Sequence, residues 1–274
     1  MDNLEFETLT AGEFREYLES QEENDYLVID VRQESEYELA HIPGARLIPL
    51  AEVESRLFSL PTDRDLIFYC HNGGRSQWAA SLVGEGEISQ KAVYHLMGGL
   101  LAWDGITLSG YPKIQLFEKI QEPEKLLRTA MDLEKGAWRF YRFAMEKFNK
   151  DSIGQVLDQL SIAEMGHAKL IYRFLQKIEA DPLPFDDYYN GLAGEILEGG
   201  LSFEEACDRL EALEKQSCTG IIDLALNIEY TAFDLCRAVA ERTDDPEVRE
   251  TFLSIAQAEK GHMRALARSI AKCH

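Results

Sequence analysis

The stretch Leu160-Ser-Ile-Ala-Glu-Met-Gly-His-Ala-Lys-Leu170 decides the fold, because it places Glu164 and His167 one helical turn apart on an otherwise apolar helix face. The same pattern returns near the C-terminus in Leu253-Ser-Ile-Ala-Gln-Ala-Glu-Lys-Gly-His-Met263. The glutamate and histidine of this second copy are Glu259 and His262, each 95 residues after its counterpart. The chain therefore contains an internal duplication.

A further glutamate precedes each copy of this pattern. Glu134 lies 30 residues before Glu164, and Glu229 lies 30 residues before Glu259. Both have alanine, aromatic and aliphatic residues at helical spacing around them, so we expect their side chains to be buried. An ionised carboxylate in such a place is costly unless it is paired or bound to a metal ion.

Together these side chains predict a di-metal site. Four carboxylates and two neutral imidazoles balance two divalent cations in charge. One Glu from each of two helices, with Glu-x-x-His from each of two more, is typical of di-iron or di-manganese four-helix bundles. Two iron ions are the expected cofactor, manganese or zinc would accept the same ligands, and the alternative is a set of salt-bridged core residues. The predicted metal ligands are Glu134, Glu164, His167, Glu229, Glu259 and His262.

Composition sets the class of protein and excludes some partners. A chain of 274 residues with a net charge of −21 can form two acidic globular domains, so nucleic acid and anionic membranes are improbable partners. The N-terminus is acidic and no stretch is apolar enough to span a bilayer, so we expect a cytoplasmic protein. The odd number of cysteines, without a Cys-x-x-Cys pair, predicts free thiols in a reducing compartment. These cysteines are Cys70, Cys207, Cys218, Cys236 and Cys273.

Residues 1–112 predict a parallel α/β domain. Short β-branched and aromatic runs at 26–30, 66–70 and 92–96 are typical of buried strands. Residues 10–19, before the first run, and residues 50–57 and 76–83, between the runs, have helical patterns. In such a fold the chemistry gathers at the carboxyl ends of the strands, and Cys70 lies at one of these ends.

The loop Cys70-His-Asn-Gly-Gly-Arg-Ser76 is the candidate catalytic loop of this domain. Backbone N–H groups of a tight turn and the start of a helix would stabilise a thiolate on Cys70. We predict Cys70 and Arg75 as catalytic residues, with Arg75 holding an anionic substrate by a forked contact and Ser76 capping the helix. The alternative is a buried cysteine before an ordinary turn. The predicted substrate-binding residues are His71, Asn72, Gly73, Gly74 and Ser76.

The sequence around this loop resembles the rhodanese family across the whole of residues 1–112. The matching motifs are Ile29-Asp-Val-Arg32, Glu36, His41-Ile-Pro-Gly-Ala45, Ile48-Pro-Leu50, the Cys70 loop, Gly98-Gly-Leu-Leu-Ala-Trp103 and Gly110-Tyr-Pro112. The resemblance implies that Cys70 takes a sulfur atom from a small donor, holds it as a persulfide and passes it to a thiol acceptor. It also implies structural roles for Asp30, Arg32, Glu36 and His41. The family usually has glycine at the position of Ala40, which puts the local turn geometry in question.

The C-terminal domain is expected at residues 123–274, after a linker at 113–122. Helices are predicted at about 123–148, 152–178, 219–242 and 246–271. Asp151 and Asp245 are the predicted N-caps of the second and fourth helices. The crossover at 179–218 includes a capping-box start at Ser202. Two helices, a long crossover and two more helices is the ferritin-like connectivity.

This domain resembles the rubrerythrins, which are non-haem di-iron proteins that generally reduce peroxides. The resemblance rests on Glu134-Lys-Gly-Ala-Trp-Arg-Phe-Tyr141 and Ala163-Glu-Met-Gly-His167. Two features depart from that family: Ala232 stands where it has an additional glutamate, and the four-cysteine rubredoxin domain is absent. Tyr141, on the ligand-bearing face, is either a partner of a metal ligand or a core residue. Cys236 is expected to be a small core residue, and Cys273 to lie in a mobile tail.

Two functions follow from these expectations. The first is a bifunctional enzyme, in which a rhodanese-like sulfurtransferase is joined to a di-iron peroxidase that depends on an external electron donor. The second is a non-catalytic module that binds iron and carries or senses sulfur. A homodimer is the expected assembly, because bundles of this kind associate through exposed apolar stripes.

Overall fold

The computed structural model describes residues 6–86, 88–117, 120, 122–148, 152–179, 181–213, 218–271 and 273. The chain divides into two compact units, Met1–Tyr111 and Pro112–His274.

The N-terminal unit is built on a parallel five-stranded sheet with the order β1-β5-β4-β2-β3. Its strands are β1 (Glu7–Leu9), β2 (Tyr26–Asp30), β3 (Arg46–Leu47), β4 (Asp65–Tyr69) and β5 (Val93–Leu96). Its helices are α1 (Ala11–Ser20), α2 (Glu34–Leu39), α3 (Leu50–Arg56), α4 (Gly74–Glu85) and α5 (Gly99–Ala102). The predicted parallel α/β class is therefore confirmed for this unit.

The central strands β2 and β4 form where the sequence has continuous apolar runs. All five residues of β2 are buried, as are the last four of β4, which explains the absence of the alternating pattern of a half-exposed strand. The short strands β1 and β3 were not predicted. With three and two residues they are too brief to produce a periodic pattern.

A buried ion pair holds the β2 end of the sheet, as the family resemblance implied for these residues. Arg32 lies 2.7 Å from Asp30, and its guanidinium also donates to the Ala40 carbonyl oxygen at 2.5 Å. Ala40 itself has an extended backbone with φ −163°, a conformation that any residue adopts. The departure from glycine at this position therefore introduces no backbone strain.

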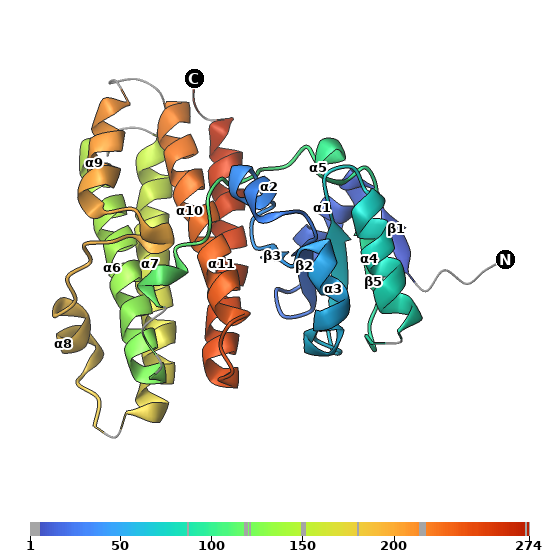
Figure 1. The fold of residues 1–274 in the computed structure, drawn as a ribbon. Coiled ribbons are helices and arrows are strands. Elements are labelled where there is room, and N and C mark those ends of the chain that lie inside the picture. The colour runs from blue at the N-terminus through green and yellow to red at the C-terminus, as the bar shows by residue number, and fades with distance from the viewer. Residues whose placement is uncertain are drawn as a thin grey trace. The chain divides into compact units, whose positions relative to one another are not determined.

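The helical unit contains four long helices that lie side by side (Figure 1). They are α6 (Pro123–Phe148), α7 (Ser152–Ile178), α10 (Cys218–Ala240) and α11 (Pro246–Ile270). Helix α6 packs mainly on α7 and α10 on α11, which are the two pairs related by the duplication, and α7 also contacts α11. The connection between the pairs includes α8 (Phe185–Asn190), η3 (Glu198–Gly200) and α9 (Phe203–Ala212). The four long helices agree with the four predicted helices to within two residues at each end.

Two of the predicted helix starts are confirmed by hydrogen bonds. The Asp245 carboxylate accepts from the backbone N–H groups of Glu247 and Val248, so it caps α11. Ser202 and Glu205 form the predicted capping box of α9. Asp151, the other predicted cap, lies outside the described residues.

The segment predicted as a linker is in part packed into the helical unit. The 3-10 helix η2 (Ile114–Leu116) lies within residues 113–122, and Ile114 and Phe117 are buried in the hydrophobic core of this unit. The Phe117 ring meets that of Phe252 edge to face, with 5.7 Å between the ring centroids. The boundary between the two units therefore falls at Pro112. Burial of the apolar Ile114 and Phe117 side chains in the helical unit is favourable, whereas a linker would leave them exposed to water.

The prediction that every cysteine is a free thiol is wrong for two of them. Cys218, at the start of α10, and Cys273, after the end of α11, form a disulfide bond. Cys273 is therefore tied to the helical unit and does not lie in a free tail. The sequence could not show this pair, because 55 residues separate the two cysteines and only the folded hairpin brings them together. Cys70, Cys207 and Cys236 are free thiols, as predicted.

Among the helices formed by the described residues, none has the length and apolar character that a membrane-crossing segment needs.

Candidate functional site

The Cys70 loop connects β4 to α4 at the carboxyl edge of the sheet, where the sequence predicts it. The Gly73 N–H donates to the Cys70 sulfur at 3.1 Å. Gly73 itself has φ +95°, and a Cβ there would lie 2.9 Å from the Gly98 backbone nitrogen. The loop thus requires glycine at this position. Gly73, not Ser76, is the N-cap residue of α4, so the predicted cap at Ser76 is wrong.

Helix α5 holds the same loop from its other side. The N–H groups of Leu100 and Leu101 donate to the carbonyl oxygens of Cys70 and His71, at 2.8 and 3.0 Å. A Cβ on Gly99 would lie 2.2 Å from the Cys70 carbonyl oxygen, so the two backbones approach as closely as they can. The Cys70 loop is consequently rigid before any substrate binds.

Hydrogen bonds to the Cys70 sulfur favour its thiolate. Burial alone would raise the pKa of Cys70, but hydrogen bonds from the Ser76 side chain and from the backbone N–H groups of Ser76, Asn72 and Gly73 lower it below the ordinary value. The Ser76 hydroxyl also lies 3.0 Å from the Gly73 carbonyl oxygen. Because a charged acceptor makes the stronger hydrogen bond, the single hydroxyl proton should turn to the sulfur once it ionises. The loop therefore produces a nucleophilic sulfur.

Arg75 is paired with a carboxylate of its own unit. Its two terminal nitrogens donate to the two Glu36 oxygens, both at 2.7 Å, and this forked contact lowers the pKa of Glu36 to about 2. The fork predicted for an anionic substrate is thus directed at Glu36, 39 residues away. An anion at Cys70 would have to compete with this carboxylate or use the remaining guanidinium N–H. The side chains of His71 and Asn72 are exposed, and the Gly74 N–H donates to the Asn72 side-chain oxygen at 3.3 Å.

In the helical unit, the structure brings all the predicted metal ligands together from four helices. Helix α6 carries Glu134, α7 carries Glu164 and His167, α10 carries Glu229, and α11 carries Glu259 and His262. The four carboxylates and His167 are buried, and the His262 side chain is 12% exposed. One helix of each packed pair therefore provides a single carboxylate, and the other provides Glu-x-x-His, as the duplication predicts.

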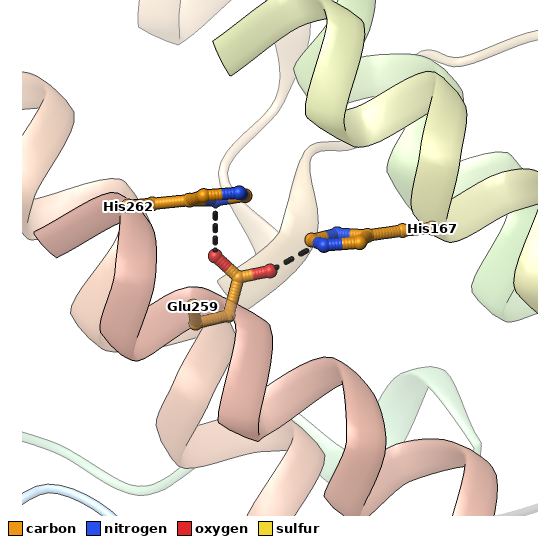
Figure 2. A group of neighbouring side chains, drawn as sticks. All are labelled: His167, Glu259 and His262. Carbon is orange, nitrogen blue, oxygen red and sulfur yellow. Dashed lines mark ion pairs between the residues drawn. The ribbon is translucent and has the colours of Figure 1, made fainter. Parts of the chain in front are cut away.

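Two of the glutamates lie between the two histidines. The Glu259 carboxylate places one oxygen 3.2 Å from His167 Nδ1 and the other 2.9 Å from His262 Nδ1 (Figure 2). The Glu164 carboxylate does the same, at 3.4 Å from His167 Nδ1 and 3.8 Å from His262 Nδ1. Each of these carboxylates presents one oxygen to each side of the cluster, which is the arrangement needed to bridge two cations.

The other two glutamates each accompany one histidine. Glu134 lies 3.2 Å from His167 Nδ1, and Glu229 lies 2.8 Å from His262 Nδ1. The two imidazole rings are stacked, with 5.1 Å between their centroids. The cluster thus has two halves related by the sequence duplication. One half has Glu134 and His167, and the other has Glu229 and His262.

The described residues leave some buried carboxylate oxygens of this cluster without hydrogen bonds. All four oxygens of Glu164 and Glu259 are buried, and although they face the histidine Nδ1 atoms, none accepts a hydrogen bond from the described residues. Burial and neighbouring carboxylates raise the pKa of Glu134 and Glu259 well above the ordinary range. Burial alone would lower the pKa of His167 and His262, but the surrounding carboxylates raise both to about 9. Cations would replace these protons and occupy the free oxygen lone pairs, so the residues fit a metal centre.

The N-terminal unit matches known proteins. Residues 10–105 match the family model of the rhodanese-like domain. The uncharacterized protein YqhL of Bacillus subtilis is 38% identical over 99 residues, which are 36% of this chain and 72% of that protein. The chain belongs to the rhodanese-like family.

Two further relatives carry functional names. The thiosulfate sulfurtransferase GlpE of Pseudoalteromonas translucida is 31% identical over 87 residues, 32% of this chain and 81% of that protein. The probable adenylyltransferase/sulfurtransferase MoeZ of Mycobacterium tuberculosis is 39% identical over 98 residues, 35% of this chain. The chain spans only 24% of the length of MoeZ.

We expect Ser76→Ala to raise the pKa of the Cys70 thiol in the rhodanese-like domain. A hydrogen bond to a charged group contributes about 1.5–3 kcal/mol, so the midpoint of thiolate formation should move upward by about 1 pH unit or more. The midpoint can be measured from the ultraviolet absorbance of the thiolate, as the difference between each protein and its Cys70→Ser form. Ser81→Ala is the matched control, because the Ser81 hydroxyl donates to Glu85 on the same helix. An unchanged midpoint in Ser76→Ala would show that the backbone N–H groups alone stabilise the thiolate.

Tyr141 and Glu198 also lie at the carboxylate and histidine cluster. The Tyr141 hydroxyl donates a hydrogen bond to Glu229, a predicted metal ligand, and its ring is buried in the hydrophobic core. Glu198, in η3, lies with Glu134, Glu164 and His167 in a group of potential metal ligands and was missed. No sequence signal pointed to it, because the crossover lies outside the duplicated helices and Leu197-Glu-Gly-Gly200 has no helical period.

Proposed function

We propose that this protein is a bifunctional sulfur and redox enzyme. Its rhodanese-like domain would act as a sulfurtransferase through a persulfide on Cys70. Its helical unit would be a ferritin-like bundle of the rubrerythrin type, with a di-iron centre that reduces peroxides. The sulfurtransferase names of the relatives GlpE and MoeZ and the hydrogen-bonded Cys70 support the first part. The unsatisfied oxygens of Glu164 and Glu259, each carboxylate directed at both histidines, are the observation that carries the second part.

Sulfur transfer needs two displacement steps at Cys70. In the first, the Cys70 thiolate attacks the outer sulfur of a small donor such as thiosulfate, forms an S–S bond and releases sulfite. In the second, an acceptor thiolate attacks the outer sulfur of the persulfide and leaves with it, which regenerates the Cys70 thiolate. The backbone N–H of Gly73, and those of Asn72 and Ser76, stabilise the negative charge before and after each step.

In the helical unit, Glu134 and His167 would hold one metal ion, and Glu229 and His262 the other. Glu164 and Glu259 would bridge the two ions, because each has an oxygen near each histidine. When bound, two ferrous ions would supply the two electrons that, with two protons from water, reduce hydrogen peroxide to two water molecules or an organic peroxide to water and an alcohol. The Tyr141 hydroxyl orients Glu229, and the burial of the carboxylates limits the access of water. The electrons would return from a separate donor protein or a thiol.

Peroxide consumption by air-free, iron-loaded protein tests this function. We expect the native protein to consume hydrogen peroxide in proportion to its ferrous iron, and Glu134→Ala to lose this activity with part of its iron. Glu146→Ala is the control, because Glu146 is exposed on the same helix. Equal peroxide consumption by native protein and Glu134→Ala would contradict the redox part of the proposal.

A further inference from the structure

Glu198 is a buried carboxylate that the duplicated ligand pattern does not include. It is 5% exposed, and its Oε1 atom has no hydrogen-bond partner among the described residues. A carboxylate oxygen of Glu198 lies within 4.8 Å of ligand atoms of Glu134, Glu164 and His167. Such an acceptor costs free energy in the interior unless something binds it, and the potential ligand group that includes it contains Glu134 and His167 of one half of the cluster.

The backbone around Glu198 is fitted closely to the helices. A Cβ on Gly136 of α6 would lie 2.1 Å from the Ile196 carbonyl oxygen, so glycine at 136 lets the crossover reach the helix surface. Gly199 has φ +75°, and a Cβ there would lie 2.3 Å from the Thr231 hydroxyl of α10. The Glu198 backbone is therefore wedged between α6 and α10 at two positions where only glycine fits.

Hydrogen bonds fix the same segment to α6. The Arg139 guanidinium donates to the carbonyl oxygens of Ala193 and Gly194, at 2.7 and 2.8 Å. The Gly194 N–H donates to the Asp132 carboxylate at 2.9 Å. These bonds hold the chain before Glu198, and the close approach of Gly199 to α10 holds it on the other side, so a rigid support presents the Glu198 side chain to the cluster, as a metal ligand requires.

Helix α10 leaves space for this side chain. Ala232, one turn after Glu229, lines a small cavity together with Glu134, Glu198 and Cys236. A longer side chain at position 232 would enter the volume that the Glu198 carboxylate borders. The small residue on α10 and the carboxylate on the crossover are thus complementary.

We propose that Glu198 is a seventh ligand of the di-metal centre and binds the ion held by Glu134 and His167. The proposal rests on the di-metal centre proposed above. In the other half, the potential ligand groups formed by the described residues place His262 with Glu164 and Glu229, and with Glu259 and His167, and neither group has a counterpart of Glu198. That half has the Tyr141 hydrogen bond to Glu229 instead. The two metal positions are therefore unequal, although the sequence repeat alone would make them alike.

Anaerobic titration of the metal-free full-length chain with Co²⁺ tests this assignment, because the visible absorption of Co²⁺ reports its ligands. We expect the native protein to bind two Co²⁺ ions in unequal steps. In Glu198→Gln, one step should weaken by at least about tenfold and change its spectrum, since the loss of even an outer partner of a ligand costs 10–100-fold in affinity. The other step should keep its affinity. Glu195→Gln is the matched control, because Glu195 is exposed in the same segment.

A second variant guards against an effect on folding. Glu198→Ala combined with Ala232→Glu returns a carboxylate to the same cavity from α10, and should regain affinity relative to Glu198→Ala alone. If Glu198→Gln binds two Co²⁺ ions with native affinities and a native spectrum, Glu198 is not a ligand. The proposal of a di-metal centre would then still hold. Failure of the native protein to bind Co²⁺ would overturn both. If Glu198→Gln does not fold, a crystal structure of the Co²⁺-loaded native protein decides, by whether a Glu198 oxygen lies within about 2.2 Å of an ion.

Discussion

We expect the native protein to bind two metal ions per chain in its helical unit, and Glu259→Ala to lose both. Glu259 is completely buried, and its two oxygens lie 3.2 and 2.9 Å from the two histidines, so each ion would lose a ligand at once. Metal analysis after air-free purification measures the loss. Glu250→Ala is the control, because Glu250 is exposed on the same helix. Retention of both ions by Glu259→Ala would show that this carboxylate is not a bridge.

The stability of the metal-free protein separates a ligand from a structural ion pair. Without metal, Glu259 is a buried carboxyl group that faces both histidines but accepts no hydrogen bond from the described residues, and burial and the neighbouring Glu229 raise its pKa. We therefore expect metal-free Glu259→Ala to unfold at a denaturant concentration equal to or above that of the metal-free native protein, as removal of an unsatisfied buried group regains about 1–3 kcal/mol against the cavity that it leaves. With metal present the order should reverse, because metal binding stabilises only the native protein. A structural ion pair would destabilise both forms of the variant alike.

Cys70→Ser is expected to abolish sulfur transfer. A serine hydroxyl remains protonated at neutral pH and cannot form a persulfide, so the rate of transfer from thiosulfate to cyanide should fall by at least about 10³-fold, to the background rate. The hydrogen bonds of the loop should remain, because oxygen accepts from the Gly73 N–H as sulfur does. Cys207→Ser is the control, since Cys207 is a partly exposed free thiol of the helical unit.

The same pair of variants tests the independence of the two units. Peroxide consumption by iron-loaded Cys70→Ser should equal that of the native protein when an artificial reductant supplies the electrons.

Two outcomes would contradict the sulfur-transfer prediction. Residual sulfur transfer in Cys70→Ser, or loss of sulfur transfer in Cys207→Ser, would show that the reactive thiol is not Cys70.

The parts that sequence reasoning predicted are those with local or repeated patterns. The helical period around Glu134 and Glu229 predicted their burial, and the Glu-x-x-His repeat predicted their partners, because a helix fixes which side chains share a face. The glycines after Cys70 predicted a tight turn, since Gly73 needs φ +95°. Each of these patterns involves residues that are close in sequence, so the local structure it predicts does not depend on distant contacts.

The parts that it missed depend on contacts between distant, unpatterned residues. Glu198 reaches the cluster because Gly136 and Gly199 let an irregular crossover approach two helices, and nothing in the local sequence shows this approach. Arg75 meets Glu36 only after β2 and β4 have paired. The Cys218–Cys273 bond likewise depends on the closing of the α10–α11 hairpin. Tertiary structure decided each of these contacts.

The most direct test of the account is the iron content of the full-length protein isolated without air, followed by optical titration with hydrogen peroxide. We predict two iron ions per chain, a nearly colourless ferrous form, and near-ultraviolet absorption that grows until one peroxide has been added for each pair of irons. Protein that binds no metal, or binds it without any optical response to peroxide, would contradict the claim that the duplicated glutamates and histidines form a redox-active di-iron centre.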